Sequence, residues 1–341
     1  MKTLLIDGDW NLKRNFKKRA DMFARGEHCG GSFGALESIR SIVNNVMPDR
    51  IINFWDGIMG GKLRKDMYAP YKENRDKSWE EESYLLTDSD VDEIKKEKYN
   101  ILQQKIKVKN YLEELCIRQL EVDYVEADDL IALYVKKRKP DEEVIIFSSD
   151  HDYYQLITKG VSIIRPSDRK LLTVDNFKEE FGYALENALF LKCFEGDVSD
   201  NISGVKGVGF KSIKKYFPKF LEEKYTLDRM LEEAKEHFEN KPLKIFEKIM
   251  NSRDVLERNR TLMNLKRPFL TEEAKREVVE IANYVIVDPD NSEDRSIKTA
   301  MRMLIADGYK QHIFNEDIEL FFRPFFRIIS KEKEYSNSLL Q

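Results

Sequence analysis

Four short apolar runs in the first half of the chain are each followed closely by a carboxylate, and this repetition limits the folds that the sequence can adopt. The runs cover residues 3–6, 50–55, 122–125 and 143–147, and a fifth apolar run covers 161–164. All are short and rich in β-branched or aromatic residues, as buried strands are. Longer segments with apolar residues at helical spacing separate them. This alternation predicts an α/β fold with a mainly parallel sheet flanked by helices.

The second half of the sequence has a different pattern. Helices of the first half are expected at 32–47, 91–116 and 127–137, but after the fifth apolar run the strand signal is lost. Helical segments separated by glycine or proline follow. We therefore expect an α/β domain at 1–174 and a helical domain at 175–341.

The acids that follow the strands form the most informative group of residues. Because the carboxyl ends of parallel strands lie at one edge of a sheet, their side chains are expected in one crevice. A single aspartate after a strand is usually a cap or a turn residue, but four such strand ends favour a shared site. We expect Asp9 to face solvent and His151 to be a turn residue. The predicted carboxylate set is Asp7, Asp56, Glu126, Asp128, Asp129, Asp150 and Asp152, to which the GDVSDN segment adds Asp197 and Asp200.

So many carboxylates in one crevice require cations, because their mutual repulsion would otherwise raise their pKa values or open the site. Ligation by oxygen alone, without histidine or cysteine, suits a hard ion such as Mg²⁺ or Mn²⁺ rather than zinc. Without these nine acids, 58 basic residues face 53 acidic ones. The remaining surface is mildly basic, which suits a substrate rich in phosphate.

The charge is distributed unevenly along the chain. Residues 57–77 hold six basic and three acidic side chains, and residues 204–219 hold five lysines and no acid, whereas 80–93 is an acidic block. Local patches of this kind, rather than the net charge of −4, decide what a surface binds. The overall charge therefore does not exclude a nucleic-acid substrate.

The rest of the composition narrows the class of protein. No apolar run reaches the roughly 18 residues of a membrane span, and the N-terminus lacks the features of a signal peptide. The three cysteines Cys29, Cys116 and Cys193 lie far apart and show no metal-binding spacing, which predicts reduced thiols in a cytoplasmic protein. Nothing in the sequence points to an oligomer, so we expect a monomer.

Four segments resemble, in the same order, the motifs of the 5′-nuclease superfamily. That superfamily includes flap endonucleases, the 5′-nuclease domain of bacterial DNA polymerase I and the phage 5′-exonucleases. The segments are FWDGIMGGKLRKDMYAPYKENR, VEADDLIA, FSSDHDYYQL and EGDVSDNISGVKGVGFKSIKKYF. The ordered match runs from Leu4 to about Phe217. The remainder is most similar to the ribonuclease H of T-even bacteriophages, through the chain's size and the segment LERNRTLMNLK.

The resemblance implies roles for individual residues. The nine carboxylates fall on the family's metal-site positions and would hold two or more Mg²⁺ ions, for which Mn²⁺ would substitute. A helical arch is implied at about 57–90, with the catalytic residues Tyr71, Lys72 and Arg75 at its base and Arg64 contacting DNA. The lysine and the arginine would neutralise a phosphate in the transition state. A helix-hairpin-helix element is implied at about 197–217. Its DNA-binding residues would be Lys206, Gly207, Gly209, Lys211, Lys214 and Lys215.

The resemblance implies a metal-dependent 5′-3′ exonuclease and flap endonuclease that removes 5′ flaps or RNA primers during DNA replication in a bacterial or phage-infected cell. Its DNA would carry a 5′ flap, a nick or an RNA primer, and a single-strand-binding protein is a possible partner. Two alternatives stay open: a PIN-type ribonuclease, which shares the acidic core, and a non-catalytic structure-specific DNA-binding protein.

One segment near the C-terminus resembles the peptide by which replication proteins bind a sliding clamp. Ile318, Phe321 and Phe322 have the spacing of its aliphatic and aromatic anchors, and Asn315 stands at the position usually held by glutamine. Aromatic runs are more often part of a core than docking sites. Exposure of the three side chains therefore decides between the two interpretations.

Overall fold

The computed structural model describes residues 1–73, 88–167, 169–283, 293–313 and 317–340. Its centre is a six-stranded sheet in the order β5-β4-β1-β6-β7-β8, in which all neighbours are parallel except β7 and β8. The α/β class predicted from the sequence is confirmed. The strands are β1 (Lys2–Asp7), β4 (Arg50–Asp56), β5 (Arg118–Val122), β6 (Glu143–Phe147), β7 (Val161–Ile164) and β8 (Leu171–Leu172).

Side chains of the central strands point alternately into two hydrophobic cores. Leu5 pairs in register with Ile52 and Ile146, and these three lie in the core on one face. Their neighbours Leu4 and Ile51 lie in the core on the other face. Both faces of the sheet are therefore buried, which is why the strand sequences are continuous apolar runs.

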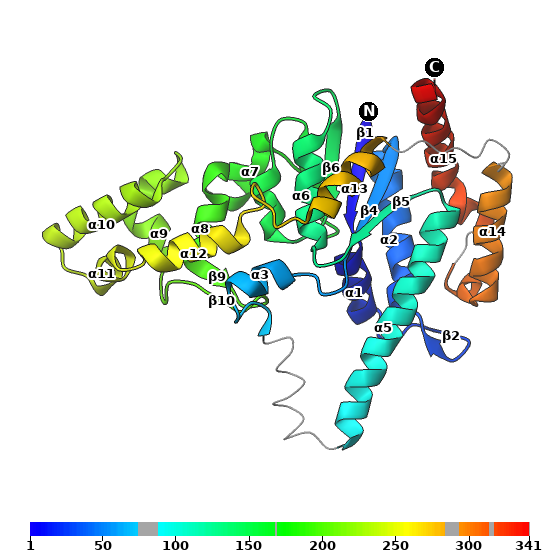
Figure 1. Cartoon of the computed structure of the whole chain (residues 1–341), viewed down its shortest axis with the longest axis horizontal. Coiled ribbons are helices and arrows are strands. Elements are labelled where there is room, and N and C mark those ends of the chain that lie inside the picture. Colours follow the sequence, from blue (N-terminus) through cyan, green and yellow to red (C-terminus); the bar gives the residue numbers. More distant parts are fainter. Residues whose placement is uncertain (74–87, 168, 284–292, 314–316, 341) are drawn as a thin grey trace.

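Helices from distant parts of the chain cover one of these faces (Figure 1). Contacts between α2, α5, α14 and α15 bring the C-terminal helices back onto the sheet. The division of the chain into two domains near residue 174 stays a prediction. The last helices, which belong to the predicted helical domain, pack on the α/β domain. The helices of this face are α1 (Gly8–Lys18), α2 (Gly30–Val46), α5 (Asp88–Glu114), α14 (Glu293–Ala306) and α15 (Ile318–Leu340).

The opposite face is covered by α6 and α13 and continues into a helical lobe. Figure 1 shows α10 and α11 of this lobe at the end of the molecule farthest from α14. Two antiparallel two-residue strands, β9 (Gly196–Asp197) and β10 (Ile202–Ser203), lie at the lobe's inner edge. The helices are α6 (Ala127–Lys137), α7 (Val174–Phe181), α8 (Ala188–Glu195), α9 (Phe210–Tyr216), α10 (Leu227–Asn240), α11 (Lys244–Met250), α12 (Arg253–Met263) and α13 (Glu272–Asn283).

A buried ion-pair network joins the last helix to the sheet. Glu332 of α15 lies between Arg50, at the start of β4, and Arg118, at the start of β5. Its carboxylate oxygens lie 3.3 Å from Nε of Arg50 and 2.5 Å from Nη2 of Arg118. The arginines also donate to the carbonyls of Ala282 and Ile281, at the end of α13. These contacts attach α13 and α15 to the amino ends of β4 and β5. The predicted site lies at the carboxyl ends of the strands.

The structure corrects two expectations. The strand expected at 122–125 lies earlier, at 118–122. The proposed clamp-binding side chains are core residues: Phe321 and Phe322 are buried in the core beneath α15, and Ile318 is also buried. The hypothesis that these side chains bind a sliding clamp is wrong for this structure, because docking side chains must be accessible in the free protein. Asn315 lies outside the described residues.

The structure describes the expected arch only in part. The only part of the expected arch that is described consists of α3 (Lys62–Met67) with its flanks, and the start of α5. No helix in the described part of the chain is long and apolar enough to cross a membrane.

Candidate metal centre and active site

The carboxyl ends of the central strands open into an acidic crevice of about 360 Å³. Asp7 ends β1, Asp56 ends β4, and Asp150 follows β6 as the N-cap of the 3-10 helix η2 (His151–Leu156). Because β1 is the parallel neighbour of β4 and β6, the strand register brings these acids to one edge. Eight of the nine predicted carboxylates line the crevice: Asp7, Asp56, Glu126, Asp128, Asp150, Asp152, Asp197 and Asp200.

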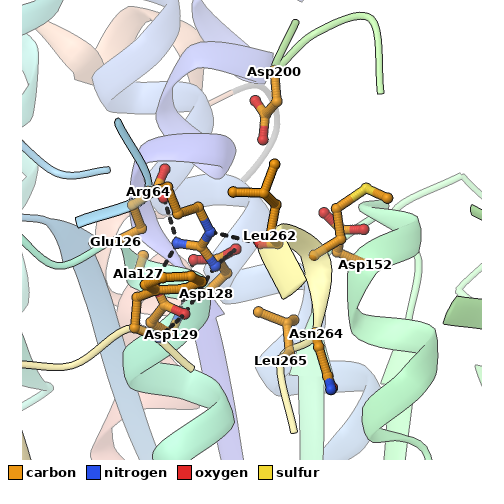
Figure 2. A network of polar contacts seen from close by, with 12 residues as sticks. Arg64, Glu126, Ala127, Asp128, Asp129, Asp152, Asp200, Leu262, Asn264 and Leu265 are labelled. Atoms are coloured by element: carbon orange, nitrogen blue, oxygen red, sulfur yellow. Dashed lines mark hydrogen bonds and ion pairs between the residues drawn. The ribbon is translucent and has the colours of Figure 1, made fainter. Parts of the chain in front are cut away.

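The ninth, Asp129, is buried in an ion-pair network with Arg64 (Figure 2). The guanidinium of Arg64 donates to both oxygens of Asp129, at 2.5 and 2.9 Å, and to Glu126 at 2.5 Å. Its Nε donates to the carbonyl of Leu262 at 2.9 Å. The carboxylates of Glu126, Asp128 and Asp129 approach within 4.8 Å of one another, a spacing that a metal ion could also bridge. The Arg64 guanidinium supplies positive charge to all three acids.

Two of the predicted site residues therefore lie behind the crevice, and their assigned roles stay predictions. Arg64 was expected to contact DNA, but only 3% of its surface is exposed and its donors point at acids inside the protein. Asp129 was expected to bind metal, but its carboxylate accepts hydrogen bonds from Arg64 and from the backbone N–H of Phe269. Both residues hold α3, α6 and the segment after α12 together. Neither lines the crevice.

Tyr71 and Lys72 connect the segment after α3 to two parts of the acidic cluster. The hydroxyl of Tyr71 is buried and donates to Glu126 at 2.9 Å and to Asp200 at 3.1 Å. The ammonium of Lys72 contacts Glu126 and lies 3.8 Å from Asp200. Burial opposes ionisation of Glu126, but Lys72 and Arg64 outweigh it and lower the pKa of that carboxyl. Lys72 lines the crevice, whereas Tyr71 lies behind it and positions the two acids.

Asp152 and Asp197 share a second lysine. The ammonium of Lys192, on α8, contacts Asp152 and lies 2.9 Å from Oδ2 of Asp197. Burial opposes ionisation of Asp197, but Lys192 outweighs it and lowers the pKa of Asp197. Burial raises the pKa of Asp152 to about 7, although Lys192 opposes that shift. Sequence reasoning missed Lys192, since a lysine inside an amphipathic helix gives no signal of its own.

The acids at the strand ends differ from these two groups in their surroundings. Among the described residues, no basic nitrogen lies within 4.0 Å of the carboxylates of Asp7, Asp56 or Asp150, as the ion pairs of the described chain show. Burial, with repulsion from Asp56, raises the pKa of Asp7 to about 7. A divalent cation would relieve this repulsion, and carboxylate oxygens suit Mg²⁺ or Mn²⁺. The residues present therefore fit such an ion.

Sequence reasoning also missed residues that α1 contributes to the crevice. Asp9 was expected to face solvent, but it is buried and its carboxylate accepts the backbone N–H of Asp56 at 2.8 Å. Its partner Lys105 on α5 lies 3.2 Å away. Lys13 and Lys17, four residues apart, line the rim of the crevice. That spacing places both on one face of α1, a signal that was present in the sequence.

The lysine-rich segment follows β10 and continues into α9 on the helical lobe. Lys206, Lys211, Lys214 and Lys215 are exposed, and Gly207 has a left-handed backbone conformation with φ of 82° at the turn before α9. A side chain is disfavoured there, which explains that glycine. The DNA-binding role of this segment, including Gly209, stays a prediction. Arg75 lies outside the described residues.

Comparison with known proteins gives the class. Residues 2–182 match the family model of the 5′-3′ exonuclease N-terminal resolvase-like domain. The chain belongs to this family and is a nuclease. A 5′-3′ exonuclease of Buchnera aphidicola is 29% identical over 220 residues, which cover 64% of this chain and 70% of that protein.

Solved structures share the fold over almost the whole chain. The 5′-exonuclease of bacteriophage T5 with bound zinc has a TM-score of 0.60 at 19% identity, covering 90% of this chain and all of that one. A complex of the T5 flap endonuclease with DNA and metal ions has a TM-score of 0.59 at 19% identity, covering 89% of this chain and 99% of that one. At these identities the likeness establishes the fold.

Proposed function

We propose that this protein is a Mg²⁺-dependent 5′-3′ exonuclease and flap endonuclease that hydrolyses phosphodiesters at the 5′ ends of DNA strands or RNA primers during replication. The observation that carries the proposal is the acidic crevice, which Asp7, Asp56 and Asp150 line without a described basic partner. Membership of the 5′-3′ exonuclease family supports the reaction. The names of the T5 relatives support a metal-dependent activity on DNA.

In this proposal the strand-end carboxylates would hold divalent ions, with Asp128 completing the set. When bound, such ions lower the pKa of a water and stabilise charge on the cleaved phosphodiester. Lys72 would neutralise charge on the phosphate as the bond breaks, since its ammonium lies at the crevice wall beside Glu126. Tyr71 and Arg64 would act only by holding Glu126 in place.

The substrate would be held through its phosphates on both sides of the crevice. Lys13 and Lys17 on α1 and the exposed lysines before and on α9 provide charge without base-specific geometry. We therefore propose recognition by shape and backbone, which suits a 5′ flap, a nick or an RNA-primed duplex. Arg75 would assist if it lies at the base of the arch.

The test compares cleavage of three 5′-labelled substrates: a flap, a nicked duplex and an RNA-primed duplex. Each is incubated with Mg²⁺ or with EDTA, using the wild type, Asp150→Asn and the control Asp141→Asn. Asp141 is an exposed aspartate before β6, outside the residues that line the crevice. We expect Asp150→Asn to abolish turnover while fluorescence anisotropy shows DNA binding retained, and Asp141→Asn to behave as wild type.

The alternatives give different results in the same assay. A PIN-type ribonuclease would leave the DNA flap and the nicked duplex intact, and would cleave a 5′-labelled single-stranded RNA included as a fourth substrate. A non-catalytic binding protein would bind the flap and cleave none of the substrates with Mg²⁺. Near-wild-type cleavage by Asp150→Asn would contradict the metal assignment.

A further inference from the structure

Lys192 lies inside the acidic cluster. It comes from α8, which packs on η2 and ends at β9. Only 16% of its side chain is exposed, and its ammonium bridges Asp152 of η2 and Asp197 of β9. A lysine buried to this degree is stable as a cation only where acids compensate it. The Asp152–Asp197 pair supplies that compensation.

The predicted metal ligands are therefore divided by their partners into three groups. Glu126, Asp128 and Asp129 share Arg64, and Lys72 lies between Glu126 and Asp200. Asp152 and Asp197 share Lys192. The third group, Asp7, Asp56 and Asp150, has no basic nitrogen within 4.0 Å in the described chain, and it is where a cation is most needed.

We propose that Lys192 is a built-in counter-ion that competes with a divalent ion for the Asp152–Asp197 pair, so that the two halves of the acidic cluster bind metal with unequal affinity. This inference rests on the proposed function. The strand-end acids would bind the first ion tightly. A second ion near Asp152 and Asp197 would have to displace the ammonium of Lys192, and the ion pairs lost would weaken its binding.

The competition follows from charge and distance. When both are ionised, the two carboxylates offer two negative charges, and Lys192 offsets one of them at contact distance. Because the site is largely buried, the ammonium cannot leave its acids without cost from desolvation. Close charge pairs at a protein–protein interface have measured coupling energies of about 1.5 kcal/mol or more. An energy of about 1.5 kcal/mol corresponds to a factor of about ten in affinity. The second dissociation constant should respond by about that factor when the charge is removed.

The experiment counts bound Mn²⁺ in the absence of DNA. Isothermal titration and electron paramagnetic resonance are applied to the wild type, Lys192→Met, Lys192→Gln and Lys192→Arg. The matched control is Lys178→Met, which removes an exposed lysine that pairs with Glu222 on the surface of the lobe. The wild type should bind one ion tightly and a second about tenfold or more weakly.

The variants separate competition from a structural role. In Lys192→Met and Lys192→Gln the second ion should bind at least about tenfold more tightly, while Lys192→Arg and Lys178→Met should match the wild type. A residue that only stabilises the fold would not strengthen metal binding when removed. If Lys192→Met does not fold, as seen by near-ultraviolet circular dichroism, the Lys192→Gln titration decides.

Two results would overturn the inference, and they are distinguishable. Two equally tight ions in the wild type, unchanged in the neutral variants, would show that Lys192 does not compete and would leave the proposed function intact. Absence of Mn²⁺ binding in the wild type and all variants would overturn the proposed function together with this inference.

Discussion

Replacing Arg64 by methionine should destabilise the protein severely and in a pH-dependent way. The substitution keeps an unbranched side chain but removes the partner of Asp129 and Glu126, both of which are buried. It also leaves the Leu262 carbonyl without its donor. Removing one partner of a buried ion pair costs about 3–5 kcal/mol, because the remaining charge is left uncompensated. We expect the free energy of unfolding to fall by this amount at pH 7.

The loss should be smaller at pH 5. Glu126 keeps Lys72 in this variant, but Asp129 keeps no described cation and can reduce the cost of its burial by taking up a proton, which is easier in acid. Urea denaturation at both pH values, followed by circular dichroism, measures the difference. Arg276→Met, on the exposed side of α13, is the control and should stay within about 0.5 kcal/mol of the wild type. A loss below about 1 kcal/mol, or an equal loss at both pH values, would refute the explanation from buried charge.

Four further predictions concern other parts of the molecule. Asp7 keeps its proton up to about pH 7 in the fold but releases it near pH 3.8 when unfolded, so metal-free protein should lose up to about 4 kcal/mol of stability between these pH values. Thermal melts of metal-free wild type and Asp7→Asn would test this, and the same pH dependence in both proteins would contradict it. Lys72→Ala should lower the single-turnover rate about 10²-fold with little change in duplex affinity, and a loss of affinity alone would make Lys72 a binding residue. Lys211→Ala should reduce the slope of log affinity against log salt by about 0.9, and an unchanged slope would leave it a solvated charge. Phe322→Ala should lower the free energy of unfolding, measured by urea denaturation, by about 3–5 kcal/mol. An unchanged free energy of unfolding would show that the side chain is not part of the core.

The strands could be predicted where their burial is complete. β6 matched its predicted range because every residue after Glu143 is apolar and buried. β5 was missed because its sequence, RQLEV, alternates and begins with a charge. Arg118 is tolerated there only because Glu332, more than two hundred residues later, meets it inside the protein. Local patterns cannot reveal such a distant partner.

The acids of the site could be predicted for a related reason, since they follow strands whose direction the alternating pattern indicates. The partners of these acids could not be. Arg64 and Lys192 are unremarkable in the sequence, and their roles depend on how α3 and α8 pack. Asp9 was misjudged because its burial depends on the backbone N–H of Asp56, on another strand.

The buried ion-pair network of Arg50, Glu332 and Arg118 limits the order in which parts of the chain can pack during synthesis. The two arginines leave the ribosome long before Glu332 does, and until then their guanidinium groups must stay hydrated. The amino ends of β4 and β5 can therefore be buried only after α15 has been made. The strand ends that carry the acidic crevice lie at the opposite edge of the same sheet. A nascent chain that lacks α15 should therefore leave the two arginines hydrated and the amino ends of these strands uncovered.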